Sequence, residues 1–270
     1  MGGFIMKLGF IGCGNMATAM MNGMIQNKIV APEDILASDA VNKALDTAKQ
    51  NLGIQTTTNN IEVASNVDVL FLSVKPQFYE TVIREIADEV KKTTLIITIA
   101  AGQSLKKVES IFERTLKIVR TMPNTPALVS EGITAVCAND QVTEEDMKLV
   151  MSLLGSFGKA EQVSEHLMDA VVAVSGSSPA YVFIMIEAMA DAAVAQGMPR
   201  DKAYKFAAQA VLGSAKMVLE TGLHPGQLKD MVCSPGGTTI EAVRVLEETG
   251  FRSSIMNAMK VCAEKSKKLS

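Results

Sequence analysis

The residues with the clearest chemical pattern are three small ones near the start of the chain. Gly12, Gly14 and Ala17 follow the pattern G-x-G-x-x-A, directly after a short apolar run at residues 8–11. In this pattern the first glycine permits a tight turn, the second lets a pyrophosphate approach the backbone, and the third small residue lets a helix pack closely on the strand. The free N–H groups and the macrodipole of that helix favour an anion. We therefore predict a dinucleotide site; a glycine-rich turn that only packs is the alternative.

A second group of small and hydroxyl-bearing residues lies at 233–241, with the sequence Cys-Ser-Pro-Gly-Gly-Thr-Thr-Ile-Glu. Two adjacent glycines before a helix let consecutive N–H groups converge on an anion. Thr238 and Glu241 have the spacing of a capping box, which would occupy the Thr238 hydroxyl and leave the Thr239 hydroxyl free. This pattern predicts a ligand-binding loop, with an ordinary helix cap as the alternative.

Alternating strands and helices are predicted to position the glycine turn. Strand-like apolar runs occur at residues 8–11, 35–37, 67–72, 94–99, 117–120 and 159–163. Ligands of open α/β sheets bind beyond the carboxyl ends of the strands, so the breaks after residues 72 and 99 belong to the predicted site. Small residues at 100–102 would let the nicotinamide end of a cofactor lie against the backbone. Lys75 either contacts the cofactor or is solvated.

Two later segments between the strands carry polar signals of their own. Pro123 and Pro126 flank an Asn-Thr pair, which predicts a rigid loop bearing polar groups or an ordinary tight connection. Thr143 is followed by three acidic residues, up to Asp146, and is expected to begin a helix in the manner of a capping box.

The end of the second predicted strand bears on the choice of cofactor. An acid at this place binds the 2′-OH of the adenosine ribose, whereas a cation or a hydroxyl can accept a 2′-phosphate. Ser38, with Asn42 and Lys43 close behind it, would accept a phosphate, and Asp39 would repel one unless it is turned away. Asp39 as a cap of the next helix is the alternative. Taken together, the side chains at this position favour NADPH over NADH.

The second half of the chain is predicted to be helical. From about residue 164 every strongly periodic stretch has helical spacing, so we predict a dinucleotide-binding domain at residues 1–163 and a helical domain at residues 164–270. One predicted helix, with Ser178 as N-cap and its end at Gly197, is apolar nearly all round and must be buried on every side. A domain of this size cannot easily surround it, so burial against a second subunit is expected. On it, Glu187 and Asp191 form either an acid/base pair or structural acids with partners of their own.

The composition narrows the class of ligand. The chain has 26 Lys and Arg against 29 Asp and Glu, a net charge of −3, so there is no basic excess typical of nucleic-acid binding and no polybasic run for a membrane surface. The four cysteines are scattered without C-x-x-C spacing, and we expect neither zinc nor disulfides. We expect no apolar run to reach the length of a membrane span, about 18 residues. A cytoplasmic protein with a small-molecule ligand is expected.

With these residues in hand, the chain resembles the pyrroline-5-carboxylate reductase family over essentially all of its 270 residues. The stretches that carry the resemblance are GFIGCGNM at 9–16, VKP at 74–76, AAG at 100–102, MPNTP at 122–126, SGSSPAY at 175–181 and DMVCSPGGTTI at 230–240. The resemblance implies an α/β fold, with an N-terminal Rossmann-type doubly wound sheet followed by an all-α C-terminal dimerisation domain. It also implies reduction of the C=N bond of Δ1-pyrroline-5-carboxylate to L-proline by hydride transfer from NADPH or NADH, the last step of proline biosynthesis.

The resemblance further implies a site at the level of residues, without a metal. The expected cofactor residues are Ile11, Gly12, Cys13, Gly14, Asn15, Met16, Ser38, Asn60, Ser73, Val74, Lys75, Pro76, Ala100, Ala101 and Gly102. The expected substrate residues are Glu165, Ser234, Gly237, Thr238 and Thr239. Thr239, with its hydroxyl free, is expected to be the catalytic residue and to hydrogen-bond the ring nitrogen. Members of the family form intertwined homodimers, often assembled into decamers.

Two other functions fit part of the sequence. A β-hydroxyacid dehydrogenase has a similar two-domain layout but uses a lysine early in its helical half, and no lysine occurs between Lys159 and Lys202. A nucleotide-sensing protein that binds NADP without turnover would keep Gly12 and Gly14 but would not need the 234–239 loop. Turnover measured on a panel of substrates separates these functions.

Overall fold

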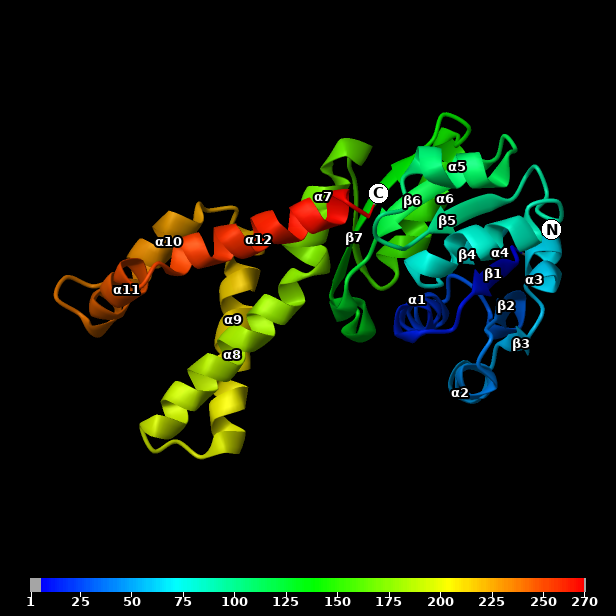
Figure 1. Ribbon diagram of the computed structural model, residues 1–270. Helices are drawn as coiled ribbons and strands as arrows, with labels where there is room; N and C mark the ends of the chain where they lie inside the picture. Colours follow the sequence, from blue (N-terminus) through cyan, green and yellow to red (C-terminus); the bar gives the residue numbers. More distant parts are fainter. Residues whose placement is uncertain (1–5, 270) are drawn as a thin grey trace. The chain divides into compact units, whose positions relative to one another are not determined.

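Within the described residues, 6–269, of the computed structural model, eight strands pair into one sheet (Figure 1). The strands are β1 (Leu8–Ile11), β2 (Ile35–Ser38), β3 (Gln55–Thr57), β4 (Val69–Leu72), β5 (Leu95–Thr98), β6 (Lys117–Met122), β7 (Gly132–Ala138) and β8 (Gly158–Gln162). Their order is β3-β2-β1-β4-β5-β6-β7-β8. Strands β1 to β6 are parallel, and β7 is antiparallel to β6. The strand order reverses between β1 and β4, which is where open sheets of this type bind ligands.

Two layers of helices cover the sheet. Helices α1 (Asn15–Gln26), α2 (Asn42–Leu52) and α6 (Glu144–Gly155) contribute to the core on one face. Helices α3 (Asn60–Asn66), α4 (Tyr79–Ile86) and α5 (Leu105–Phe112) contribute to the core on the other face. The four residues of β4 are all buried because both faces are covered, which explains its uninterrupted apolar sequence. The expected Rossmann-type doubly wound sheet is confirmed.

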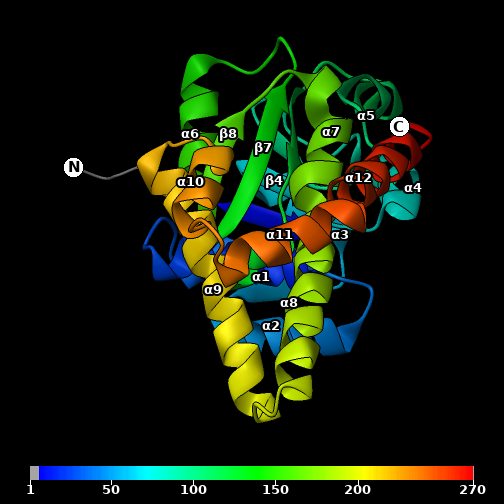
Figure 2. The ribbon, with the colours of Figure 1, turned by 90° about the vertical axis from the view of Figure 1, so that its left-hand side faces the viewer.

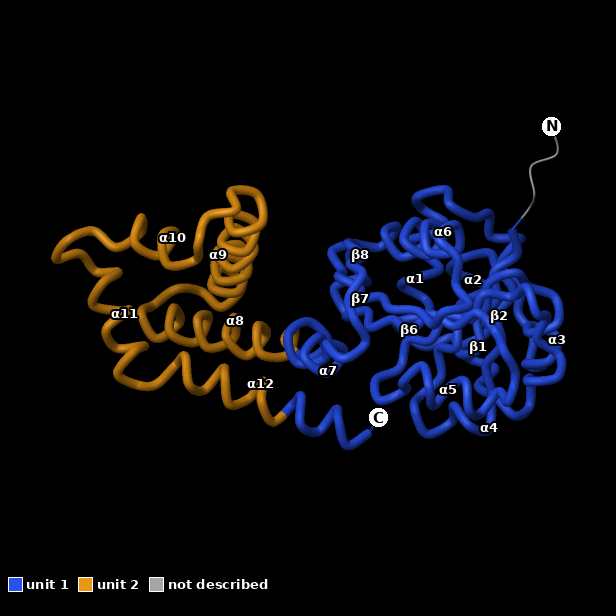
Figure 3. Tube along the Cα trace, turned by 90° about the horizontal axis from the view of Figure 1, so that it is seen from above, with its two compact units in different colours: residues 1–177, 262–270 blue, residues 178–261 orange. Residues whose placement is uncertain are grey.

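The remaining helices belong largely to a second compact unit, residues 178–261 (Figure 3). They are α8 (Ser178–Ala195), α9 (Arg200–Thr221), α10 (Pro225–Val232), α11 (Thr238–Glu248) and α12 (Phe251–Lys267). Helices α8 and α9 pack side by side as an antiparallel pair (Figure 2). The end of α12, from Cys262 onward, belongs to the first unit together with residues 6–177.

The division into units therefore differs from the boundary expected at 163/164. Helix α7 (Met168–Val171) and the π-helix Val172–Gly176 stay with the sheet, because Met168 is buried in one of its two cores. The end of α12 is bonded to the same segment: the Ser266 hydroxyl lies 2.6 Å from Asp169 Oδ1, and the Cys262 thiol lies 3.2 Å from the Ser177 hydroxyl. Because the π-helix runs almost directly into α8, Ser178 is the first residue of that helix and not a separate cap.

Helix α8 is the expected apolar helix, but the described chain does not surround it. Ala190 is its one buried residue there, and Phe183 and Ile184 are 63% and 67% exposed. The helical stretch over residues 165–195 is also long and apolar enough to cross a membrane by length and composition, which corrects the expectation that no such run exists. The core helix of a soluble protein meets the same two criteria.

The capping box predicted at the start of α6 is confirmed. The Thr143 hydroxyl accepts the Asp146 N–H at 3.2 Å, and Asp146 Oδ2 accepts the Thr143 N–H at 2.9 Å. Lys117 Nζ, at the start of β6, lies 2.8 Å from the same carboxylate oxygen. Burial raises the pKa of Asp146, but hydrogen bonds from Lys117 and Thr143 outweigh it and hold the pKa below its usual value.

We predict that Asp146→Asn lowers the free energy of unfolding at pH 7 by about 1–2 kcal/mol, because the cap and the ion pair are both weakened. The folded-state pKa lies below the unfolded value of about 3.9, so this stabilisation is complete above that value and is lost as the pH falls through the folded pKa. Melting curves from pH 7 to pH 3 should therefore converge for wild type and variant. Glu145→Gln, on an exposed residue of the same turn, is the control; a gap between wild type and Asp146→Asn that stays constant with pH would contradict the prediction.

Candidate functional site

The glycine turn is built by a close approach between β1 and β4. Gly12 has φ of 103°, in the left-handed region that favours glycine, and a Cβ there would lie 2.7 Å from the carbonyl oxygen of Ser73. The Gly12 N–H donates to the Ser38 carbonyl at 2.7 Å. The Ser73 hydroxyl lies 3.0 Å and 2.9 Å from the carbonyl oxygens of Ile11 and Gly12. Backbone groups at the ends of β1, β2 and β4 thus fix the turn.

Gly14 leaves open space at the start of α1. It is the N-cap residue, and no side chain occupies the first N–H groups of the helix. A Cβ on Gly14 would have no neighbouring atom within 4 Å. Asn15 and Met16 form the first turn that these N–H groups belong to. Free helix N–H groups next to open space suit a pyrophosphate, so the turn fits a dinucleotide.

A cavity of about 470 Å³ adjoins this turn at the carboxyl ends of β1, β2 and β4. It is lined by Ile11, Gly12, Gly14, Asp39, Ala40, Val41, Asn60, Ser73, Val74, Lys75, Phe78, Thr81 and Val82. The structure thus brings together the glycine turn, Asn60 and residues 73–75 of the expected cofactor set. Pro76 lies between them and Phe78, in the short 3₁₀ turn Pro76–Phe78. Phe78, which the sequence did not point to, adds an exposed aromatic face.

The second strand ends differently from the expectation. Ser38 is fully buried, and its hydroxyl lies 2.7 Å from Asn60 Oδ1. In the structure this hydroxyl thus bonds Asn60, and its contact with a 2′-phosphate stays a prediction. Asp39 accepts the Cys13 N–H at 2.7 Å and the Val41 N–H at 2.8 Å. The carboxylate is therefore held against the glycine turn, and Val41, not Asp39, is the N-cap of α2.

The expected residues 100–102 follow β5 and are not part of the cavity lining. Gly102 has φ of 72°, and a Cβ there would lie 2.7 Å from the Cβ of Leu269, just after α12. Lys107 Nζ lies 3.3 Å from the carbonyl oxygens of both Gly102 and Leu269. The loop that starts at Ala100 is thus packed against the end of α12.

Glu165, an expected substrate residue, has partners within the fold. Its Oε1 accepts the Leu105 N–H at 2.8 Å and lies 2.9 Å from the Arg120 guanidinium, which is 6% exposed. Glu165 therefore neutralises a buried cation and bonds the first residue of α5. A substrate contact through its other oxygen stays a prediction.

The loop before α11 corrects the predicted capping box. Helix α11 begins at Thr238 with Gly237 as N-cap, and Glu241 pairs with Arg244 at 3.2 Å instead of reaching back to the cap. The Gly237 N–H donates to the Ser234 carbonyl at 3.0 Å, and Gly236 has φ of 68°. Within the described chain neither the Thr238 nor the Thr239 hydroxyl has a hydrogen-bond partner. The start of α11 thus offers free N–H groups and two free hydroxyls together.

Other candidate groups have structural partners. Asp191 forms an ion pair with Arg200, which favours structural acids over an acid/base pair on α8. His224 Nδ1 accepts the Gly226 N–H at 3.0 Å and caps α10. Burial, with the charge of Asp39, raises the pKa of Cys13 to about 12, so this thiol in the glycine turn stays protonated at neutral pH. Among residues 6–269 no group of three His, Cys, Asp or Glu side chains is placed to hold a metal ion.

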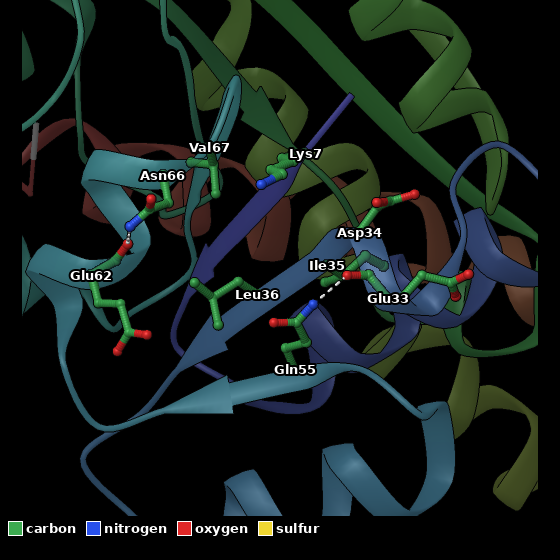
Figure 4. Close-up of a pocket in the computed structure, with 9 residues that line it drawn as sticks. All are labelled: Lys7, Glu33, Asp34, Ile35, Leu36, Gln55, Glu62, Asn66 and Val67. Carbon is green, nitrogen blue, oxygen red and sulfur yellow. Dashed lines mark hydrogen bonds between the residues drawn. The ribbon is translucent and has the colours of Figure 1, made fainter. Parts of the chain in front are cut away.

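A smaller cavity, of about 240 Å³, lies at the opposite edge of the sheet (Figure 4). It is lined by Lys7, Glu33, Asp34, Ile35, Leu36, Gln55, Glu62, Asn66 and Val67. Lys7 precedes β1, and Ile35 and Gln55 begin β2 and β3, so the cavity is at the amino ends of the strands, away from the usual ligand edge. Its three carboxylates would repel a pyrophosphate. The larger cavity therefore fits a dinucleotide better than this one does.

Comparison with known proteins adds a separate line of evidence. Residues 165–269 match the family model for pyrroline-5-carboxylate reductase dimerisation, and residues 7–102 match the model for coenzyme F420-dependent NADP oxidoreductase. The chain is 53% identical to pyrroline-5-carboxylate reductase from Escherichia coli K12 over 98% of both chains, and 46% identical to that from Methanosarcina acetivorans over 97% of both. The crystal structure of Plasmodium falciparum pyrroline carboxylate reductase with NADP bound is similar with a TM-score of 0.91, at 34% identity, over 99% of both chains.

Substitutions of the two glycines of the turn are predicted to have different effects on cofactor binding and on stability. Gly14→Val places its side chain in open space, so it should raise the dissociation constant for a dinucleotide tenfold or more while the melting temperature stays near that of wild type. Gly12→Ala meets the Ser73 carbonyl in a left-handed conformation and should also lose about 1–3 kcal/mol of stability. Cofactor titration and thermal melting of both variants check this; a folded Gly14→Val with wild-type affinity would show that no pyrophosphate lies over the turn.

Proposed function

The chain belongs to the pyrroline-5-carboxylate reductase family, and we propose that it reduces the C=N bond of Δ1-pyrroline-5-carboxylate to L-proline by hydride transfer from NADPH, the last step of proline biosynthesis. The observation that carries this proposal is the 53% identity with the Escherichia coli reductase over 98% of both chains. The two helix starts without a side-chain cap, after Gly14 and after Gly237, support it, because the pyrophosphate of the cofactor and the carboxylate of the substrate are both anionic groups.

NADPH is the proposed cofactor, with NADH as the alternative, and it supplies the hydride. The proposed binding residues are 11–16 at the glycine turn, 73–76 after β4 and 100–102 after β5, with Asn60 between them. Ser38 would act through its hydrogen bond to Asn60. The choice of NADPH is supported by the NADP in the Plasmodium falciparum structure.

The proposed substrate is a five-membered cyclic imine that carries a carboxylate. We propose that the carboxylate binds the Thr238 N–H and the Ser234 hydroxyl, and that Thr239 hydrogen-bonds the ring nitrogen. Gly237 shapes the loop, since its own N–H bonds the Ser234 carbonyl. Glu165 is the remaining proposed substrate residue. Because a protonated imine is already an electrophile, the protein need only position it and hold its charge. The engagement of His224 as a helix cap fits a reaction that requires no histidine acid.

We propose that residues 164–270 form the dimerisation and substrate part of a cytoplasmic homodimer. The exposed apolar side chains of α8 support this, since burying about 1,000 Å² of apolar surface contributes on the order of 25 kcal/mol before entropy costs. Helix α8, which makes up most of the apolar stretch at 165–195, is then a subunit-interface helix and not part of a membrane span. Assembly of dimers into decamers is a further proposal that a mass measurement tests.

The decisive test of the function is a spectrophotometric assay of cofactor oxidation. Purified protein is mixed with Δ1-pyrroline-5-carboxylate and either NADPH or NADH, and the product is identified as L-proline. Turnover with a 3-hydroxyacid and an oxidised cofactor instead would favour the β-hydroxyacid dehydrogenase alternative. Cofactor binding without turnover on any substrate would favour a nucleotide sensor.

Two threonine variants test the roles within the α11 loop. Thr239→Val keeps the side-chain shape and removes one hydrogen bond to a partly charged group, so kcat/KM should fall by about ten- to a hundredfold, or 1.5–3 kcal/mol. Since neither hydroxyl caps the helix, both Thr239→Val and Thr238→Val should melt close to wild type. If Thr238→Val is the more damaged in turnover, the assignment of the ring nitrogen to Thr239 is wrong.

A charge on α8 tests the dimer. Ile184→Lys puts an ammonium group on a residue that is exposed in the single chain and buried in the proposed interface, so it should shift the protein toward monomers and lower its melting temperature. Light scattering over a range of concentrations measures the mass. Lys202→Gln, on an exposed residue of α9, is the control. A folded, active monomer of the wild type at assay concentration would exclude an obligate dimer.

A further inference from the structure

The side chain of Tyr79 joins the ends of two neighbouring strands. Its ring is 1% exposed, in the core that α4 forms with the sheet. The hydroxyl donates to the carbonyl of Leu72, the last residue of β4, at 2.6 Å. It accepts the N–H groups of Ile99 and Ala100, just after β5, at 3.3 Å each. Three backbone groups from two strand ends thus converge on one phenol oxygen.

Each of these groups borders a segment that we assign to the cofactor. Leu72 is followed by Ser73, whose hydroxyl bonds the glycine turn. Ala100 is the first residue of the loop that follows β5. Tyr79 itself begins α4 directly after Phe78, which lines the larger cavity. The tyrosine is not part of the cavity lining, so its effect on a ligand passes through the backbone.

The Tyr79 hydroxyl hydrogen-bonds backbone groups at the point where the pairing of β4 and β5 ends. Strands β4 and β5 are paired up to Leu72 and Thr98, which are the last residues of the two strands. Buried backbone groups that lose their strand partner need another one, and the phenol provides a donor and an acceptor at once. Burial raises the pKa of Tyr79, and the hydrogen bonds from Ile99 and Ala100 lower it only in part. The hydroxyl therefore keeps the proton that it donates to Leu72 at any pH suitable for an assay.

We propose that Tyr79 is a positioning residue for the dinucleotide, whose hydroxyl fixes the spacing between the loop after β4 and the loop after β5. This inference rests on the proposed function, because it takes a nicotinamide dinucleotide as the ligand of both loops. Tyr79 acts through residues 72, 99 and 100 and does not touch the cofactor. Its role is thus distinct from that of a core aromatic side chain, which would need only its ring.

The test compares Tyr79→Phe, which removes only the oxygen, with Ile86→Ala. Ile86 is a fully buried residue at the end of the same helix and in the same core, without a polar contact to either loop. The dissociation constant for NADPH is measured by its fluorescence. Tyr79→Phe should raise it about tenfold, equivalent to one net hydrogen bond of about 1.4 kcal/mol, whereas Ile86→Ala should lower the melting temperature and leave the constant unchanged.

Steady-state kinetics adds a second readout. Tyr79→Phe should raise KM for NADPH more than KM for Δ1-pyrroline-5-carboxylate. With NADPH deuterated at the transferred position, Tyr79→Phe should show a larger isotope effect on kcat than the wild type. The reason is that hydride transfer becomes slower relative to the other steps. A loss of core packing alone would move neither ratio. Wild-type NADPH affinity in a folded Tyr79→Phe, or an equal loss of affinity in Ile86→Ala, would overturn the proposal.

The two proposals fail separately in this design. If the wild type binds NADPH but reduces no pyrroline-5-carboxylate, the proposed function fails while the binding comparison still tests Tyr79. If Tyr79→Phe does not fold, fluorine NMR of the 3-fluorotyrosine-labelled wild type replaces it, since the chain has three tyrosines and Tyr181→Phe and Tyr204→Phe assign the Tyr79 signal. A Tyr79 signal that shifts with NADPH supports the inference, and one that does not move overturns it.

Discussion

The close approach of Gly12 to the backbone of Ser73 determines how the sheet can serve a ligand. A side chain at Gly12 would overlap the Ser73 carbonyl, so the turn brings β1 and β4 together only because that side chain is absent. The hydrogen bonds of Gly12 to Ser38 and of Ser73 to Ile11 then satisfy the strand ends internally. What remains unsatisfied is the start of α1. The structure thus satisfies the strand ends and leaves the helix N–H groups for a ligand.

The sequence predicted the elements that have an apolar run or a recognisable glycine spacing, and it did not predict the elements that lack such a pattern. The six expected strands form, and the glycine spacing located the turn. Strand β3 was missed because it has three residues, Gln-Thr-Thr, at the edge of the sheet and shows no apolar run. Strand β7 begins with a glycine and mixes small residues, which hides its burial. Helix α10 begins with Pro-Gly, a turn-like pair, and is capped by a histidine.

The residues around the cavity show a similar limit. Residues 73–75 and Asn60 gather beside the glycine turn as expected, because strand ends in parallel sheets meet at one edge. The hydroxyl of Ser38 could not be placed from sequence, since its partner Asn60 is 22 residues away. The sequence predicted Thr238 as the N-cap of α11, but the N-cap is Gly237. A glycine N-cap has no side chain, so the sequence pattern did not indicate it. The role of Tyr79 could not be predicted from the sequence, because its hydroxyl bonds backbone groups, and these are the same in almost every residue type.

The contact between Gly102 and Leu269 has a consequence for how the protein is made. The loop after β5 is synthesised early, but its packing partner follows much later, since Lys107 and Leu269 are 162 residues apart. The bond between Asp169 and Ser266 spans 97 residues in the same way. The sheet unit therefore cannot be completed on the ribosome while the helices between these residues are still being translated. Until then the Gly102 loop exists without the surface that holds it.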